Sequence, residues 1–184
     1  LGVNAEARER QVALVLCKGG NAVASRKFVY NGVADCAAAA LVAGGDKACA
    51  YGCLGLGSCA RACPVGAVEI TTDGLALVHP ELCISCGKCV AVCPRHIIRM
   101  VPESAEIHVL CSSKDRGPVV RKICSVGCIG CTLCARQQPE AIHMEGALAV
   151  VDYKQPLTDE TVIAKCPQKT IARRPGRREA ATCA

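Results

Sequence analysis

How this chain folds follows from one run of residues, Cys83-Ile-Ser-Cys86-Gly-Lys-Cys89-Val-Ala-Val-Cys93-Pro94. Its cysteines are spaced C-x2-C-x2-C-x3-C and the last is followed by proline, which is the spacing that holds iron–sulfur clusters in bacterial proteins. Three closely spaced thiolates can wrap one corner of a cubic [4Fe–4S] cluster, whereas the fourth points away and binds a different cluster. The run therefore predicts a matching run elsewhere in the chain.

The matching run lies upstream and departs from the pattern at one position. It is Cys49-Ala-Tyr-Gly-Cys53-Leu-Gly-Leu-Gly-Ser-Cys59-Ala-Arg-Ala-Cys63-Pro64. Aligned on its Cys-Pro ending, this run has Leu56 where the second ligand would stand, so Cys49 or Cys36 must supply the missing thiolate. We expect one cluster on Cys63, Cys83, Cys86 and Cys89, and another on Cys53, Cys59, Cys93 and, as the favoured fourth ligand, Cys49. Between the runs, residues 65–70 and 75–78 flank an Asp73-Gly74 turn and predict a hairpin.

A second, reduced copy of this arrangement follows in the C-terminal half. Residues 107–111 repeat the strand-then-cysteine pattern of residues 11–17, and the Cys124-x3-Cys128 spacing repeats that of Cys49 and Cys53. The positions of all ligands of one cluster have lost their cysteines together and now hold Gln138, Pro156, Asp159 and Val162. The ligands of the other cluster all remain, namely Cys128, Cys131, Cys134 and Cys166. Random loss of cysteines would rarely remove every ligand of one cluster and keep every ligand of the other. We therefore expect a ferredoxin backbone that holds a single cluster.

The cysteines outside these three sets suggest a further site. Four of them come from corresponding places in the two repeats, namely Cys17, Cys36, Cys111 and Cys124. We expect them to hold a fourth cluster that bridges the halves, with Cys36 and Cys49 able to exchange roles. The alternative is that some of the four are buried thiols that bind no metal. Cys183, in the basic tail, is expected to be unligated.

Together the motifs predict an α+β fold of ferredoxin-like iron–sulfur modules, built as two pseudo-repeats of short strands and short helices. Residues 1–48 are expected to supply cluster cysteines from strands at 11–17 and 28–30 and from a helix. That helix should run from Cys36 to Val42, with Asp35 as its N-cap and Gly44-Gly45 as its stop. The other predicted units are a two-cluster ferredoxin module at 49–104, the second repeat at 105–172, with a helix from Thr158 to Lys165, and a disordered basic tail at 173–184.

Composition supports cofactors as part of the core. Apolar residues make up 51% of the chain, but aromatic residues only 2%, and 17 residues are cysteine. A disulfide scaffold is disfavoured because the cysteine count is odd and no signal peptide is visible. Zinc is the stronger alternative, since paired C-x2-C loops also make tetrahedral sites, but the third cysteine and the Cys-Pro endings favour iron–sulfur clusters.

Charge and the remaining motifs exclude other function classes. The formal charge of +6 counts every thiol as neutral, and four clusters of about −2 each would bring the total near −2, so it does not argue for nucleic acid. No apolar run reaches the length needed to span a bilayer. Gly55-Leu-Gly57 lies inside a cysteine run rather than between a strand and a helix, so it predicts no dinucleotide site. The histidines share no metal-binding spacing, and no catalytic set is evident; they are His79, His96, His108 and His143.

Beyond the cysteine spacing, several stretches resemble one family closely. These are Tyr30-Asn-Gly-Val-Ala-Asp-Cys36, Cys49-Ala-Tyr-Gly-Cys-Leu-Gly-Leu-Gly-Ser-Cys59, Cys93-Pro-Arg, Leu110-Cys-Ser-Ser-Lys-Asp-Arg-Gly117 and Gly127-Cys-Ile. In them the chain resembles the cytoplasmic iron–sulfur portion of the B subunits of the Rnf (Rsx) ion-translocating electron transport complexes. The resemblance implies an electron relay without a catalytic site of its own, between reduced ferredoxin and the membrane subunits of an ion-pumping ferredoxin:NAD oxidoreductase. It also implies a location on the cytoplasmic side of the inner membrane.

Family members carry a membrane anchor and a further cluster domain that this sequence lacks, and the chain begins at Leu1, so we expect a fragment that is peripheral by itself. The alternative function is a free-standing polyferredoxin or an iron–sulfur subunit of a hydrogenase or dehydrogenase complex. Basic residues beside the cysteine runs are candidates for raising cluster potentials or steering an acidic ferredoxin, namely Arg61, Lys88, Arg95 and Arg99.

Overall fold

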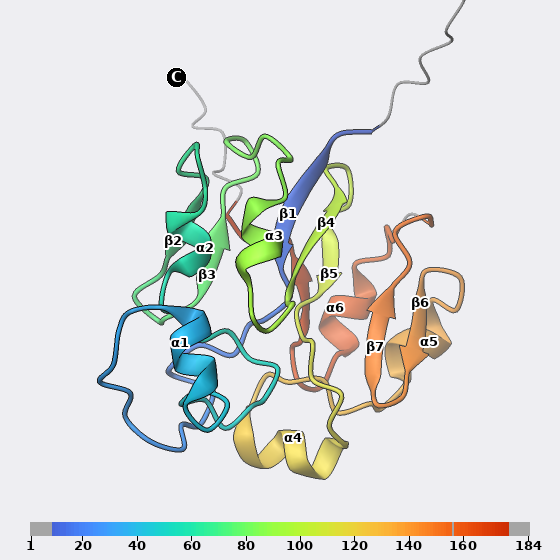
Figure 1. The fold of residues 1–184 in the computed structure, drawn as a ribbon. Coiled ribbons are helices and arrows are strands. Elements are labelled where there is room, and N and C mark those ends of the chain that lie inside the picture. The colour runs from blue at the N-terminus through green and yellow to red at the C-terminus, as the bar shows by residue number, and fades with distance from the viewer. Residues whose placement is uncertain (1–8, 156, 177–184) are drawn as a thin grey trace, which may run out of the picture.

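The computed structural model describes residues 9–155 and 157–176 and consists of short elements (Figure 1). In the first half these are β1 Gln11–Val15, α1 Cys36–Leu41, α2 Ser58–Arg61, β2 Val68–Ile70, β3 Ala76–Val78, α3 Lys88–Val92 and β4 Ile98–Pro102. In the second half they are β5 Ile107–Val109, α4 Gly117–Ile123, α5 Leu133–Gln137, β6 Ile142–Glu145, β7 Leu148–Val151, α6 Thr161–Lys165 and β8 Ile171–Arg173.

Both halves have the same topology. In the first half β1 pairs antiparallel with β4, and β2 forms a hairpin with β3. In the second half β5 pairs antiparallel with β8, and β6 forms a hairpin with β7. The two halves lie beside each other in Figure 1, with α1 and α4 at one end of the molecule. The α+β ferredoxin-like fold with two pseudo-repeats is therefore confirmed.

The strand β1 closes the sheet of the first half although it lies far from β4 in the sequence. Its register runs from Gln11 opposite Pro102 to Val15 opposite Ile98. The side chains of Val12 and Val101 are both completely buried at this pairing. Because β1 ends just before Cys17, the sheet fixes where that cysteine stands.

Each half has its own small core of aliphatic residues and cysteines. The first includes Val12, Val101 and Cys89, and the second includes Ile142 and Val162. With aromatic residues at only 2% of the chain, these cores contain little bulk beyond valine, isoleucine and alanine. Thiols lie in or against both cores, so any cofactor held there adds to the packed interior.

Two predicted elements of the first half form as expected. The carboxylate of Asp35 accepts hydrogen bonds from the amides of Ala37 and Ala38, both at 2.9 Å, and so caps α1. The hairpin β2–β3 turns at Gly74, which has a φ of 68°. Its strands are shorter than the predicted ranges because the residues before Val68 form the turn after Cys63.

One other predicted element is absent, and another forms and ends at Lys165 as predicted but starts later. Residues 28–30 form no strand, because no neighbouring strand edge lies beside them, and Val29 is 73% exposed. The helix α6 begins at Thr161 rather than Thr158. There the carboxylate of Asp159 accepts a hydrogen bond from the amide of Thr161 at 2.9 Å, a local bond that competes with helix geometry.

The two halves are held together at the end where α1 and α4 lie. The amide of Ser25 donates to the carbonyl of Ile123 at 2.8 Å, and the amide of Ser125 donates to the carbonyl of Val23 at 3.0 Å. These bonds bring residues near Cys17 and Cys124 together from opposite halves. In the part of the chain that the structure describes, no helix has the length and apolarity to cross a membrane.

Candidate iron–sulfur cluster sites

Three cysteine runs share one backbone conformation. In each, a residue in the loop and the residue just before the helix have positive φ, namely Gly55 and Gly57, Ser85 and Gly87, and Gly130 and Thr132. The loop then enters a short helix whose second residue is the third cysteine of the run, namely Cys59, Cys89 or Cys134. The shared geometry places Leu56 at the position of Cys86 and Cys131, as the sequence alignment predicts.

Glycine is required at two of these turns because the loop packs on a hairpin. A Cβ atom on Gly55 would lie 2.3 Å from the carbonyl oxygen of Gly74, and one on Gly130 would lie 2.8 Å from that of Ala147. Both distances are too short for a side chain to fit. Each cysteine loop therefore rests directly on the β-hairpin of its own half.

Site 1 is the group Cys63, Cys83, Cys86 and Cys89. Burial raises the pKa of the Cys89 thiol, and the neighbouring thiols of the other three raise it further. The sulfur of Cys63 accepts a hydrogen bond from the amide of Ala67 at 3.2 Å, and that of Cys83 accepts one from Ala13 at 3.5 Å. Cys86 is the exposed member, so site 1 reaches the protein surface.

Site 2 is the group Cys36, Cys53, Cys59 and Cys93, which line one pocket. Burial raises the pKa of the Cys59 thiol to about 12, and the other three thiols raise it further. The amide of Cys36 donates to the hydroxyl of Ser58 at 2.8 Å, and this hydroxyl donates to Asp35 at 2.8 Å. These bonds tie α1 to α2, so that Cys36 takes the place that Leu56 leaves without a thiol.

Site 3 is the group Cys128, Cys131, Cys134 and Cys166, which line one pocket. Burial raises the pKa of the Cys134 thiol, and the thiols of Cys128, Cys131 and Cys166 add to the effect. The structure thus brings together the four cysteines that the second repeat retains.

Side chains of the second half occupy the positions where its other ligands are missing. The side-chain amide of Gln138 donates to the carboxylate of Asp159 at 3.0 Å, and that of Gln137 does so at 2.9 Å. Hydrogen bonds from Thr161 and Gln137 lower the pKa of Asp159 to about 2. Val162 is 1% exposed and belongs to the second core. Pro156 lies outside the described residues.

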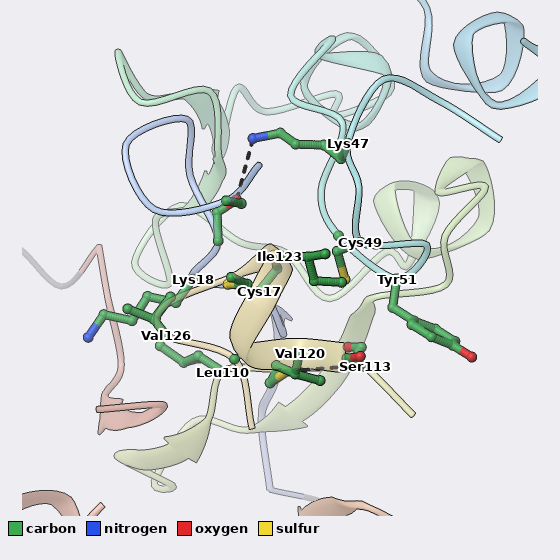
Figure 2. A pocket seen from close by; sticks show the side chains of 17 residues that line it. Cys17, Lys18, Lys47, Cys49, Tyr51, Leu110, Ser113, Val120, Ile123 and Val126 are labelled. Carbon is green, nitrogen blue, oxygen red and sulfur yellow. Dashed lines mark hydrogen bonds between the residues drawn. The ribbon is translucent and has the colours of Figure 1, made fainter. Parts of the chain in front are cut away.

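Site 4 lies between the two halves and is the group Cys17, Cys49, Cys111 and Cys124, which line one pocket (Figure 2). Burial raises the pKa of the Cys17 thiol to about 12 and that of the Cys111 thiol to about 11. The sulfur of Cys17 accepts a hydrogen bond from the amide of Cys53 at 3.4 Å. In the same way, the sulfur of Cys111 accepts one from the amide of Cys128 at 3.4 Å. The site has a pseudo-twofold arrangement, with two thiols from each half.

The structure exchanges Cys36 and Cys49 relative to the favoured sequence grouping. Cys36 stands with the site 2 thiols and Cys49 with the site 4 thiols. A signal for this exchange was present in the repeat, because Cys124 is the counterpart of Cys49, whereas α4 contains no counterpart of Cys36. Every other predicted ligand falls in its expected group, and Cys183 lies outside the described residues.

The donor sets fit iron–sulfur clusters. Each group offers four soft thiol donors, and three of the groups surround cavities. A tetrahedral zinc site instead needs four ligands about 2.3 Å from one point. In residues 9–155 and 157–176, no three His, Cys, Asp or Glu side chains stand close enough together to bind one metal ion.

The basic residues beside the runs divide into two kinds. Arg61 forms an ion pair with Asp35 at 3.5 Å, and Arg95 donates to the carbonyls of Ala50 and Gly44, so both hold loops in place. Lys88 and Arg99 are exposed, and in the described chain neither forms an ion pair. Sequence reasoning missed Lys47, a buried lysine beside site 4.

Comparison with known proteins agrees with this geometry. Residues 76–99 match the family described as 4Fe-4S binding domain. The chain is 44% identical over 173 residues to the B subunit of the proton-translocating ferredoxin:NAD(+) oxidoreductase complex of Clostridium ljungdahlii. It is 39% identical over 173 residues to the B subunit of the Na(+)-translocating ferredoxin:NAD(+) oxidoreductase complex of Acetobacterium woodii. It is also 39% identical over 172 residues to the B subunit of the ion-translocating oxidoreductase complex of Methanosarcina acetivorans.

These matches cover nearly all of this chain but only part of each relative. They include 92, 94 and 93% of this chain, respectively. They include 61, 52 and 65% of the relatives, so the chain spans between about half and two thirds of their length. Over more than nine tenths of its length, the chain is a relative of the B subunits of the ion-translocating oxidoreductase (Rnf) complexes.

Proposed function

We propose that this chain relays electrons through four [4Fe–4S] clusters inside an Rnf-type complex. The relay would run between ferredoxin and the membrane subunits of an ion-pumping ferredoxin:NAD oxidoreductase, on the cytoplasmic side of the membrane. The observation that carries the proposal is the division of the described cysteines into four groups of four. The names of the relatives support the choice of ferredoxin and of other complex subunits as partners.

The ligand sets follow the four groups. Sites 1 and 2 are the two clusters of the first ferredoxin module, with Cys36 as the fourth ligand of site 2. Site 3 is the single cluster of the second module, where the contact of Gln138 with Asp159 and the burial of Val162 take the place of a partner cluster. Site 4 is the bridging cluster. Each cluster, when bound, supplies reversible one-electron transfer.

The protein residues hold the clusters and tune them. Backbone amides donate to cysteine sulfurs at sites 1 and 4, and hydrogen bonds of this kind raise the potential of a cluster. Burial raises the pKa of the thiols of Cys17, Cys59 and Cys111. As free thiols these residues would stay protonated, and coordination to a metal removes the proton.

The links between sites suggest their order in the relay. Sites 1 and 2 are joined because Cys63 and Cys93 each belong to the run that wraps the other site. Site 2 is joined to site 4 by the hydrogen bond from the amide of Cys53 to the sulfur of Cys17. Site 4 is joined to site 3 by the equivalent bond from Cys128 to Cys111. We therefore place the sites in the order 1, 2, 4, 3, with the exposed Cys86 at one end.

Electron delivery by ferredoxin tests this function. The chain is purified anaerobically, mixed with a small amount of reduced ferredoxin, and followed by its visible absorption and its EPR spectrum. We expect bleaching of the clusters and EPR signals from reduced sites in both halves. Cys49→Ala removes site 4 and should slow the appearance of the site 3 signal while sites 1 and 2 are still reduced. An absence of bleaching, or full-rate reduction of site 3 in Cys49→Ala, would contradict the relay.

A further inference from the structure

Lys47 is a buried ammonium group beside site 4. It is 1% exposed, less than any other lysine, arginine or carboxylate side chain that the structure describes. It lines the same pocket as Cys17, Cys49 and Cys124, and Figure 2 shows its side chain at the edge of this group, with the nitrogen end directed away from Cys49. Lys18 also lines the cavity, but its ammonium group donates to the carbonyl of Lys169 at 3.2 Å, on the exposed side.

The hydrogen-bond partners of Lys47 are neutral. Its Nζ atom donates to the side-chain oxygen of Asn21 at 2.9 Å and to the carbonyl oxygen of Gly19 at 3.5 Å. Within the described chain no carboxylate forms an ion pair with it. Two carboxylates lie near the loop of residues 19–21 and Lys47: that of Asp46 pairs with Arg26 at 3.5 Å, and that of Asp73 accepts a hydrogen bond from the amide of Ala22 at 2.8 Å. A buried cation without an anion is strongly unfavourable, so this site calls for a negative group nearby.

Site 4 is in a position to provide that negative group. Gly19, whose carbonyl accepts the Lys47 hydrogen bond, packs against the thiols of the site. A Cβ atom on Gly19 would lie 3.3 Å from the sulfur of Cys124 and 3.7 Å from that of Cys17. One residue therefore separates the ammonium group from two of the four thiols. Four thiolates around a bound cluster would form a net anion on the other side of Gly19.

We infer that Lys47 is a positioning residue whose fixed positive charge raises the reduction potential of the site 4 cluster. The inference rests on the proposed bridging cluster. Reduction adds one electron and no proton, so the net negative charge at the site grows by one, and a cation in a low-dielectric interior favours that change. Without Lys47, burial alone would disfavour the more highly charged reduced form. Lys47 thus keeps the middle of the relay reducible by its neighbours.

The test is an EPR-monitored redox titration of the full chain, with dithionite as reductant and redox mediators. The site 4 signal is assigned as the one missing in Cys49→Ala. In Lys47→Met we expect unchanged iron content and about a tenfold lower ratio of reduced to oxidised site 4 at a fixed potential, a shift of ~59 mV for a one-electron couple. Lys47→Arg should keep the wild-type potential, since the charge is retained.

Two further variants keep the inference testable if Lys47→Met folds poorly. Asn21→Asp places a carboxylate against the Lys47 ammonium group from an exposed position. It should lower the reduction potential of site 4, as Lys47→Met does, but by a smaller amount. Lys165→Met removes a charge directly before Cys166 but at an exposed position. Because water screens that charge, the ratio of reduced to oxidised site 3 at a fixed potential should change by less than about twofold.

The outcomes separate this inference from the proposed function. If Lys47→Met and Asn21→Asp keep four clusters with the wild-type site 4 potential, the role of Lys47 is wrong and the relay stands. If wild-type protein lacks a signal that Cys49→Ala removes, the bridging cluster and the role of Lys47 are both wrong.

Discussion

At the scale of single residues, Cys36 and Cys49 show how position decides the role of a thiol. Both precede Cys53, and either is close enough in sequence to replace the ligand lost at Leu56. The hydrogen bond from the amide of Cys36 to Ser58 brings Cys36 to site 2. Cys49 instead stands against thiols of the other half. Substitution of either cysteine should therefore remove the cluster at its own site and leave the other site intact.

Double substitutions test this assignment through iron content. Cys49→Ala and Cys111→Ala each remove site 4, so each should lower iron by about four atoms per chain, and the double variant should lower it by no more. Cys36→Ala with Cys111→Ala affects two sites and should lower iron by about eight. Equal losses from the two double variants would contradict the grouping.

His108 is a second residue whose environment has a measurable consequence. It is completely buried, and its Nδ1 atom lies 3.0 Å from the hydroxyl of Tyr153. Burial, helped by the nearby Arg174, lowers the pKa of His108 to about 3. Below its ordinary pKa near 6.5, the unfolded chain takes up a proton that the folded chain does not. Stability should therefore fall as the pH drops from about 6.5 toward 3.

We expect His108 to contribute a loss of roughly 1.4 kcal/mol in the free energy of unfolding for each pH unit in that range. His108→Gln stays neutral and should remove this loss between pH 6.5 and 5.5. Anaerobic denaturant titrations at several pH values measure it. His143→Gln, at a half-exposed histidine, is the matched control and should keep the wild-type slope. An unchanged slope in His108→Gln would contradict the role assigned to burial.

At the scale of elements, the residue before each ligand helix decides how well the cysteine loop is held. Gly57, Gly87 and Thr132 all have positive φ there. Glycine adopts this conformation without strain, whereas a β-branched residue such as Thr132 is strained in it. The α5 loop therefore stores strain that the α2 and α3 loops do not.

Exchanging these residues should change stability in opposite directions. Thr132→Gly should stabilise the protein by roughly 1 kcal/mol, and Gly87→Thr should destabilise it by a similar amount. A Cβ atom on Gly87 meets no atom within 4 Å. The effect of Gly87→Thr on stability should therefore come from backbone strain and not from a steric clash. The measurement is the rate of cluster loss at a fixed elevated temperature under anaerobic conditions. Destabilisation by Thr132→Gly would show that the threonine side chain makes a contact that outweighs its strain.

Local sequence signals predicted some elements and not others. The N-cap Asp35 and the Asp73-Gly74 turn predicted α1 and the first hairpin because those signals act within a few residues. The strand expected at 28–30 rested on β-propensity alone, which forms no strand without a partner edge. The pairing of β1 with β4 joins residues about ninety positions apart, and no local signal specifies such a contact. The spacing of cysteines within the runs predicted the groups of sites 1 and 3. Cys36 stands at no characteristic spacing from its run, so spacing could not assign it to a site.

At the scale of the whole molecule, the proposed relay makes the two halves one electron path. Site 1 reaches the surface at Cys86, and site 4 lies where the halves meet. Exposed basic residues near the first module are therefore placed to attract an acidic electron carrier. Lys88 directly precedes the site 1 ligand Cys89, and Arg99 lies on β4.

Charge reversal tests this docking. Lys88→Glu combined with Arg99→Glu should slow reduction by ferredoxin by roughly tenfold at low salt, and the difference should fade at high salt. Stopped-flow bleaching measures the rate. Arg121→Glu on α4, a charge reversal elsewhere, is the control and should have a smaller effect. The same slowing in the control, or none in the double variant, would contradict docking on the first module.

The most direct test of the four-cluster relay is the content of iron and acid-labile sulfide in anaerobically purified protein. Four [4Fe–4S] clusters predict about sixteen of each per chain. About twelve of each would remove the bridging site between the halves and break the proposed path. Zinc in place of iron would contradict the electron-transfer function as a whole.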